Sequence, residues 1–252
     1  MIGALVVALL AVAPICRVTG IPDEHGYFGG QVATCDLDGD GVVDSTTVTF
    51  TRTPWGDLDN FRVVVAGRTY EGTGDALDST FAILDVDTTD AQLEIAIPEE
   101  GPSDDYATTI LAYRDGRIVA LGKLEGSSEL HADGSGVIRT KNRATTICTW
   151  WHDAEYRIGA SGTLEEVPRD RYYMGMSVAM KKSLTLPASD GKGTVRLRKG
   201  DRVTLESTDD HSWVNIRTES GKTARCPIDI EGRLTSDGLD SYDVFDGLSF
   251  AD

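Results

Sequence analysis

The sequence predicts an all-β protein with two domains. Apolar and polar residues alternate with period two over many short segments, whereas helical periodicity is almost absent. Glycine, aspartate, asparagine and serine separate these segments at short intervals, as they do in β-sandwiches, barrels and propellers. A chain of 252 residues is long enough to bury a substantial core in one or two domains.

The first domain is expected between residues 21 and 168. The alternating runs that predict its strands are 46–53, 61–66, 80–84, 93–97, 108–113, 117–121, 137–140 and 145–151. The Asp115-Gly116 pair favours a tight hairpin turn with positive φ. Trp150 and Trp151 must point to opposite faces of a strand, so one is expected in the core while the other is free to stack on a sugar.

One stretch of this domain, residues 35–44, has the spacing of a calcium-binding loop. Carboxylates stand at loop positions 1, 3, 5 and 9, and Gly41 at position 6 permits the sharp bend that such a loop needs. The expected ligands are the side chains of Asp36, Asp38 and Asp40, the carbonyl of Val42, and Asp44 directly or through water. The alternative is a solvated acidic turn that binds no cation.

The residues after this loop distinguish it from a helical EF-hand. Position 12, which is glutamate in the EF-hand, is Thr47 here, and the chain then alternates threonine with apolar residues. We therefore expect the loop to lead into a β-strand.

A second group of carboxylates repeats this pattern more weakly. Asp85, Asp87, Asp90 and Glu94 lead into another predicted strand, although the glycine and the regular third carboxylate are missing. These four residues form a second predicted cation site. The alternative is a turn held by hydrogen bonds from the backbone to the carboxylates.

Together the two loops resemble the FG-GAP and VCBS-type repeats of extracellular β-propellers, in which D-x-D-x-D-G-x-x-D precedes a strand. The resemblance covers residues 32–158. Residues 83–87, 94–96 and 101–106 also resemble exported proteins of Gram-positive bacteria that carry wall-associated modules. Because a full propeller needs at least four blades, the resemblance implies a partial or degenerate propeller, or another β-architecture.

A connector is expected at residues 169–180, followed by a small barrel at 181–230. Its predicted strands are 183–186, 194–197, 202–206, 213–218 and 223–228. Residues 197–203 (L-R-K-G-D-R-V) and 213–217 (W-V-N-I-R) resemble bacterial SH3 (SH3b) domains, although Ala224-Arg225 replaces their final Gly-Trp. The resemblance implies an SH3-like barrel that attaches to peptidoglycan or its peptides. Trp213 is then the expected ligand contact, with a place in the barrel core as the alternative.

The two ends of the chain have different characters. Residues 1–20 contain an unbroken apolar run, 2–15, which is too short to span a bilayer and fits the core of a secretory signal. We therefore expect export without a membrane span, and lipidation of Cys16 stays open. The acidic tail, 231–252, contains aromatic residues that suggest docking on a domain. In an exported protein, Cys35 and Cys148 are candidates for a disulfide, although the sequence cannot select a pairing.

The charge distribution limits the partners. The net charge is -17, and residues 1–168 contribute -16 of it, from 11 basic and 27 acidic residues. This charge argues against a nucleic-acid partner and suits the uptake of Ca²⁺.

No catalytic motif occurs, so an enzyme is not expected. The prediction is a non-catalytic, calcium-binding protein, extracellular or at the cell surface, whose partner is a cell-wall glycan or peptide or a surface protein. The alternative is a cell-wall hydrolase or an accessory subunit of one.

Overall fold

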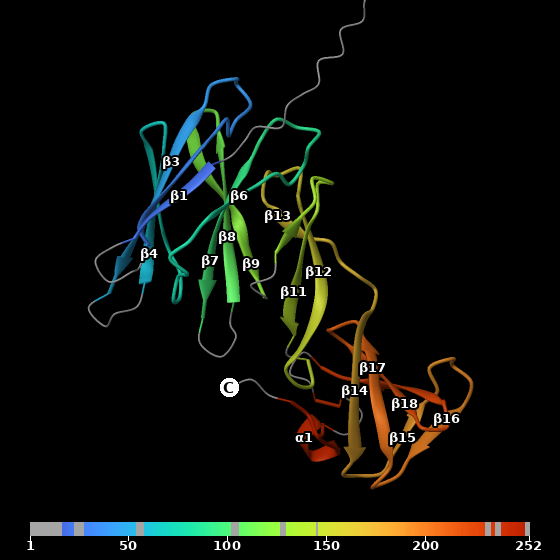
Figure 1. The fold of residues 1–252 in the computed structure, drawn as a ribbon. Coiled ribbons are helices and arrows are strands. Elements are labelled where there is room, and N and C mark those ends of the chain that lie inside the picture. Colours follow the sequence, from blue (N-terminus) through green and yellow to red (C-terminus); the bar gives the residue numbers. More distant parts are fainter. Residues whose placement is uncertain are drawn as a thin grey trace, which may run out of the picture.

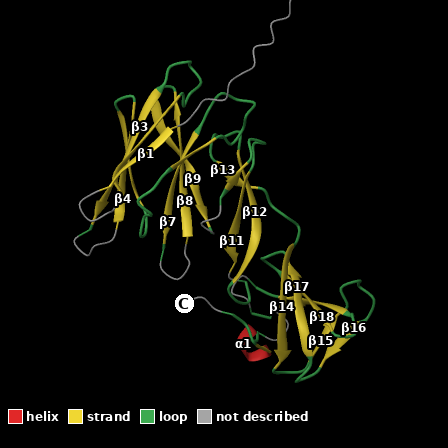
Figure 2. Ribbon diagram, viewed as in Figure 1, coloured by secondary structure: helices red, strands yellow, loops and turns green. Residues whose placement is uncertain are grey.

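The computed structural model describes residues 17–22, 28–53, 58–101, 106–126, 130–144, 146–229, 233–234 and 238–249. The predicted apolar run 2–15 and most of the loop 101–106 lie outside these ranges. Strands dominate the described residues, with one short helix among them, so the all-β prediction is confirmed (Figure 2). None of the described helices has the length and apolar character that a membrane crossing requires.

The first part of the chain forms three antiparallel sheets in which consecutive strands are neighbours (Figure 1). The first sheet contains β1 (Arg17–Pro22), β2 (Phe28–Cys35), β3 (Asp44–Arg52), β4 (Leu58–Val65) and β5 (Arg68–Thr73). The second contains β6 (Ala82–Leu84), β7 (Glu94–Glu100), β8 (Tyr106–Arg114) and β9 (Arg117–Glu125). The third contains β10 (His131–Ala132), β11 (Ile138–Ala144), β12 (Trp150–Ile158) and β13 (Leu164–Glu166).

The second sheet is buried on both faces, because it packs between the other two. Successive side chains of a strand point to opposite faces. Ile95 and Ile97 of β7 accordingly share a hydrophobic cluster with Val63 of the first sheet. Ala96, which lies between them, belongs to a different cluster that includes Ile138 of the third sheet. The three sheets therefore have two continuous cores between them, and β9 contacts both β5 and β13.

The rest of the chain builds a curled sheet and a hairpin. The additional elements are β14 (Tyr172–Met180), β15 (Leu184–Pro187), β16 (Thr194–Leu197), β17 (Arg202–Thr208), β18 (Trp213–Thr218), β19 (Thr223–Pro227), α1 (Ser241–Val244) and β20 (Phe245–Asp246). The curled sheet has the order β19-β18-β17-β14-β20, with bulges in β14 and β17. The β15–β16 hairpin closes against β19 through a bridge between Ala188 and Ala224.

Most predicted strands are present, with local differences. The five runs predicted for the second domain correspond to β15–β19, with ends within two residues of those expected. The predicted run 145–151 is displaced, because residues 146–149 form a bend and β12 begins at Trp150. The predicted Asp115-Gly116 turn is confirmed, with φ values of 51° and 67°. Strands β1, β2, β5, β10, β13, β14 and β20 were not predicted.

The region expected to be a connector requires a correction. Residues 172–180 form β14, a nine-residue strand that pairs with both β17 and β20. Its inward-facing residues alternate regularly along the whole strand, so the sequence does contain a strand pattern. The pattern was obscured by the apolar Tyr173 on the outward face and by Gly175, which has φ of 68° beside a bulge in the pairing with β17. The tail docks as predicted: β20 pairs with β14, and Phe245 is buried.

The bend before β12 joins the third sheet to the core of the curled sheet. Ile147, Cys148 and Trp150 are buried in one hydrophobic cluster with residues of the curled sheet and of the β15–β16 hairpin. Ser241 donates its hydroxyl hydrogen to the carbonyl of Ile147 at 2.8 Å, and the Ser249 hydroxyl donates to Thr149 at 2.8 Å. These bonds hold Ile147 at φ of 71°, which is costly for a β-branched residue.

The structure does not contain the considered disulfide between Cys35 and Cys148. Cys35 lies in the cluster between the first two sheets, while Cys148 lies in the cluster of the curled sheet, where its Sγ is 3.6 Å from Met176 Sδ. The fold separates the two cysteines because it assigns them to different cores.

Cys148 is expected to react slowly with alkylating agents in the native protein. Burial raises the pKa of the Cys148 thiol to about 11, so that roughly 0.1% of it is thiolate at pH 8. Mass spectrometry after iodoacetamide treatment measures the rate, and unfolding in urea should accelerate it. Rapid modification of the native protein, or a peptide linking Cys148 to Cys35, would contradict this assignment.

Candidate metal centre

The first acidic loop joins β2 to β3 and brings together three of the predicted ligands. One carboxylate oxygen from each of Asp36, Asp38 and Asp40 lies within 4.8 Å of the others. Two oxygens that bind one Ca²⁺ at its usual distance are at most about 5 Å apart. The three carboxylates therefore fit a single cation. In the described part of the chain, no other group of three His, Cys, Asp or Glu side chains meets this criterion.

Backbone hydrogen bonds shape this loop around Asp36. Its two carboxylate oxygens accept hydrogen bonds from the N–H groups of Gly39 at 2.8 Å and Gly41 at 2.9 Å. Both glycines have positive φ, 73° and 86°, so the loop turns sharply at the two positions where a side chain would be strained. Asp38 and Asp40 also accept bonds from N–H groups two residues later. The loop thus curls with its carboxylates on one side.

Asp44 closes the loop at the start of β3. Its Oδ2 accepts a hydrogen bond from the N–H of Leu37 at 3.1 Å, which ties the two ends of the loop together. Burial raises the pKa of Asp44 above its usual range, and the three other carboxylates of the loop raise it further. A bound cation would relieve this repulsion by offsetting the clustered negative charge. The side chain of Val42 is exposed, as expected for a residue that would offer only its carbonyl.

The second group of predicted ligands is less convergent. No three of Asp85, Asp87, Asp90 and Glu94 place oxygens within 4.8 Å of one another. Asp87 accepts hydrogen bonds from both the backbone N–H and the hydroxyl of Thr89, at 2.9 and 2.6 Å. Asp90 accepts one from the N–H of Gln92 at 2.9 Å. These bonds are those of a carboxylate-supported turn, which was the alternative to a second cation site.

Glu94 is the buried member of this group. Its side chain is 1% exposed, and burial raises its pKa to about 7, an effect that nearby Asp90 and Asp85 increase. Two contacts favour its ionised form: the N–H of Val86 donates to Oε2 at 3.3 Å, and Arg114 Nη2 lies 3.6 Å from Oε1. Glu94 is therefore a titratable group near neutral pH beneath the second loop.

A third loop, between β10 and β11, was not predicted to accompany the two acidic loops. It contains Asp133, which pairs with Arg139 at 2.6 Å and accepts a bond from the N–H of Ser135. Hydrogen bonds from Ser135 and Arg139 hold the Asp133 pKa at about 2. The sequence signal for this loop is the stretch Asp-Gly-Ser-Gly at residues 133–136, just before a strand. This signal is weak because the stretch contains a single carboxylate.

The three loops lie side by side. Leu93 N–H, at the end of the second loop, donates to the carbonyl of Leu37 in the first at 2.9 Å. On the other side, Thr88 N–H donates to Gly134 of the third loop at 3.0 Å. A Cβ at Gly39 would lie 2.3 Å from that of Ala91, so the first and second loops are in close contact. Strands β2–β5, β6–β9 and β10–β13 each form a four-stranded meander, with β1 added at the edge of the first. Each of the three loops joins the first two strands of its meander.

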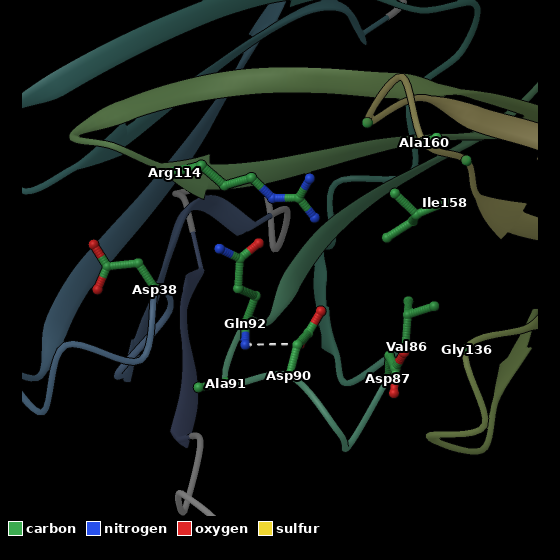
Figure 3. A pocket seen from close by; sticks show the side chains of 12 residues that line it. Asp38, Val86, Asp87, Asp90, Ala91, Gln92, Arg114, Gly136, Ile158 and Ala160 are labelled. Atoms are coloured by element: carbon green, nitrogen blue, oxygen red, sulfur yellow. Dashed lines mark hydrogen bonds between the residues drawn. The ribbon is translucent and has the colours of Figure 1, made fainter.

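A cavity of about 550 Å³ opens beside the loops (Figure 3). Arg114 and Gln92 project toward it, Asp38 lies at one side, and Ile158 lies at the other. The cavity belongs to all three sheets, because its lining also includes Gly136 of the third loop. Acidic and basic groups both border it, so its chemistry is that of a polar site.

Trp213, the residue predicted to contact a ligand, begins β18 and is half-buried. The guanidinium carbon of Arg225 lies 4.4 Å from the centre of its ring. The turn before it is fixed by Asp209, whose Oδ1 accepts hydrogen bonds from the N–H groups of Ser212 and Trp213 at 2.8 and 3.0 Å. Trp213 is thus neither fully in the core nor freely exposed. Of the adjacent pair, Trp150 is buried and Trp151 is 36% exposed, as expected.

No protein-family model matches this chain, and a search of curated proteins finds none that is significantly similar to it. The resemblances to FG-GAP, VCBS and SH3b sequences therefore rest on the quoted motifs.

Proposed function

We propose that the protein is a non-catalytic, calcium-binding protein of the cell exterior that binds cell-wall or surface ligands. The observation that carries this proposal is the convergence of Asp36, Asp38 and Asp40 in a loop with the D-x-D-x-D-G spacing. Oxygen ligands at this spacing suit Ca²⁺ better than softer metals. The cation would be structural, because it would fix the β2–β3 loop against the second loop.

Two features support the finer architecture that we propose. Three consecutive meanders each have a turn containing aspartate between corresponding strands, which favours a partial propeller related to the FG-GAP and VCBS-type repeats. Five short strands within 184–227, with a curled sheet and a closing hairpin, favour an SH3-like barrel. We propose the barrel as an attachment module, with Trp213 and Arg225 at a contact surface.

Calcium is expected to raise the midpoint of thermal unfolding. A ligand at a hundred times its Kd that binds only the folded state adds about 2.7 kcal/mol, or about 5–10 °C for a protein of this size. Circular dichroism or scanning calorimetry in calcium and in EDTA measures the shift. Asp38→Ala should abolish most of it, because it removes one of the three convergent carboxylates.

Asp170→Ala is the matched control, since it removes an exposed carboxylate far from the loop in sequence. It should respond to calcium as the wild type does. A wild-type midpoint that is the same in calcium and EDTA would mean that the loop is an acidic turn. Retention on isolated cell walls, without release of soluble fragments, tests the non-catalytic binding role.

A further inference from the structure

A groove runs along the outward face of β11 and β12 and ends against β14. It consists of two adjoining cavities of about 220 and 430 Å³, whose linings share Lys141, Asp153 and Arg169. The larger cavity ends at Trp151 and Tyr173. The groove therefore has a charged part over the strands and an aromatic end.

The strand pairing explains why Trp151 lies on the outside. Trp150 and His152 point inward, and the His152 ring lies 5.3 Å from that of Trp150 and 4.2 Å from that of Tyr172. Because side chains alternate, Trp151 and Asp153 must share the outward face. These tilted ring contacts pack the inner face of β12 beneath the exposed Trp151.

Tyr173 lies beside the bulge in β14. It is 70% exposed, the largest exposed fraction among the large hydrophobic side chains that the structure describes. A Cβ at Gly175 would lie 2.7–2.9 Å from the Tyr173 ring, so the ring lies back over this glycine. The missing side chain of Gly175 thus leaves room for the aromatic side chain to rest against its own strand.

The groove is basic in a strongly acidic protein. Four cationic side chains line it, against the carboxylates of Asp153 and Glu155; they are Arg139, Lys141, Arg169 and Arg171. Glu155 is shared, at 3.4 Å from Arg139 and 3.5 Å from Arg169, and Arg139 also pairs with Asp133 at 2.6 Å. Lys141 and Arg171 form no ion pair within the described ranges, so both are available to an anionic ligand.

We propose that this groove binds an acidic saccharide chain, with sugar rings on Trp151 and Tyr173 and sugar carboxylates at Lys141 and Arg171. The proposal rests on the proposed function, since it names the class of surface ligand. Aromatic faces attract the apolar C–H faces of sugars, and charged donors beside them fix carboxylates. A simple anion would leave the two exposed rings unused, and a neutral glycan would leave the two cations unpaired.

A hyaluronan hexasaccharide tests the proposal, with chitohexaose as a neutral probe of equal length. We expect calorimetric binding of the acidic probe at least tenfold tighter than that of the neutral one, and weaker binding as salt rises. Trp151→Ala and Tyr173→Ala should each reduce the affinity about tenfold, as loss of a stacking contact does. Lys141→Gln and Arg171→Gln should also weaken binding and reduce its dependence on salt.

Tyr242→Ala is the matched control, because it removes a 41% exposed aromatic side chain that does not line the groove. It should bind as the wild type does. The proposal is overturned if neither probe binds, if both bind equally, or if the groove variants bind the acidic probe normally. Preferential binding of an acidic peptide at the same residues would also overturn it.

The calcium response is measured separately on the same proteins, so the two proposals can fail independently. Trp151→Ala should keep the calcium-dependent rise in its unfolding midpoint, which also shows that the variant is folded. If the wild type gains stability with calcium but binds neither saccharide, the groove proposal alone is overturned. If it binds the acidic probe but calcium does not stabilise it, only the calcium site is overturned.

Discussion

Replacing Phe245 with alanine is expected to lower the free energy of unfolding by about 3–5 kcal/mol. Phe245 is 1% exposed and pairs with Met180 at the edge of the curled sheet. Its ring lies in the cluster that also contains Trp150 and residues of the curled sheet. The substitution therefore leaves a cavity where the tail, the curled sheet and the third sheet meet. Urea denaturation followed by tryptophan fluorescence measures the loss.

Tyr242→Ala provides the comparison within the same short segment. Tyr242 is 41% exposed, so its truncation should cost less than about 1 kcal/mol. If the two variants lose equal stability, the tail is held by its backbone and not by the burial of Phe245. If neither loses stability, the tail does not contribute to the core in solution.

Glu94 is expected to make the protein less stable as the pH rises from about 4.5 to 7. Burial raises the pKa of this carboxyl from 4.5 to about 7, so the folded state holds its proton more tightly than the unfolded state. Stability is then lost as the pH rises through this window, by about 3 kcal/mol once Glu94 is ionised in both states. Denaturation midpoints between pH 4.5 and 8, measured in EDTA, give this slope.

Glu94→Gln should remove this part of the pH dependence and be more stable than the wild type at pH 8. Its amide oxygen can still accept the hydrogen bond from Val86. Glu100→Gln, an exposed position on the same strand, should leave the slope unchanged. A wild-type slope that persists in Glu94→Gln would contradict the assignment. Calcium that abolishes the wild-type slope would instead indicate that Glu94 is a ligand.

The sequence identified the strands where alternation is regular and each strand is bounded by turns. β15–β19 follow this rule, and their ends were predicted closely. β14 also alternates regularly, but the apolar Tyr173 on its outward face and Gly175 beside its bulge obscure the pattern. The strand predicted at 145–151 was displaced from β12 because apolar and polar residues alternate regularly there. In the structure, a bend precedes Trp150, and hydrogen bonds from the distant Ser241 and Ser249 stabilise it. The sequence pattern around residue 147 contains no information about hydrogen bonds to residues that lie so far along the chain.

The difference between local patterns and contacts between distant residues also applies to the candidate sites. The spacing of Asp36, Asp38 and Asp40 is local, so the sequence could predict that their carboxylates converge. The groove depends on placing Trp151 beside Tyr173, which lie on different strands and meet only through packing of β12 against β14. Sequence indicated that one tryptophan would be exposed, but it contained no signal that a second aromatic residue would lie in the same cavity.

The hydrogen bonds between the bend before β12 and the tail have a consequence for the order in which the protein can fold during synthesis. They join residues 94 and 100 positions apart, so Ile147 and Thr149 leave the ribosome long before Ser241 and Ser249. The first two sheets can assemble from their own neighbouring strands. Until the tail arrives, however, nascent chains would leave Ile147, Cys148 and Trp150 incompletely covered, a surface for chaperones to recognise.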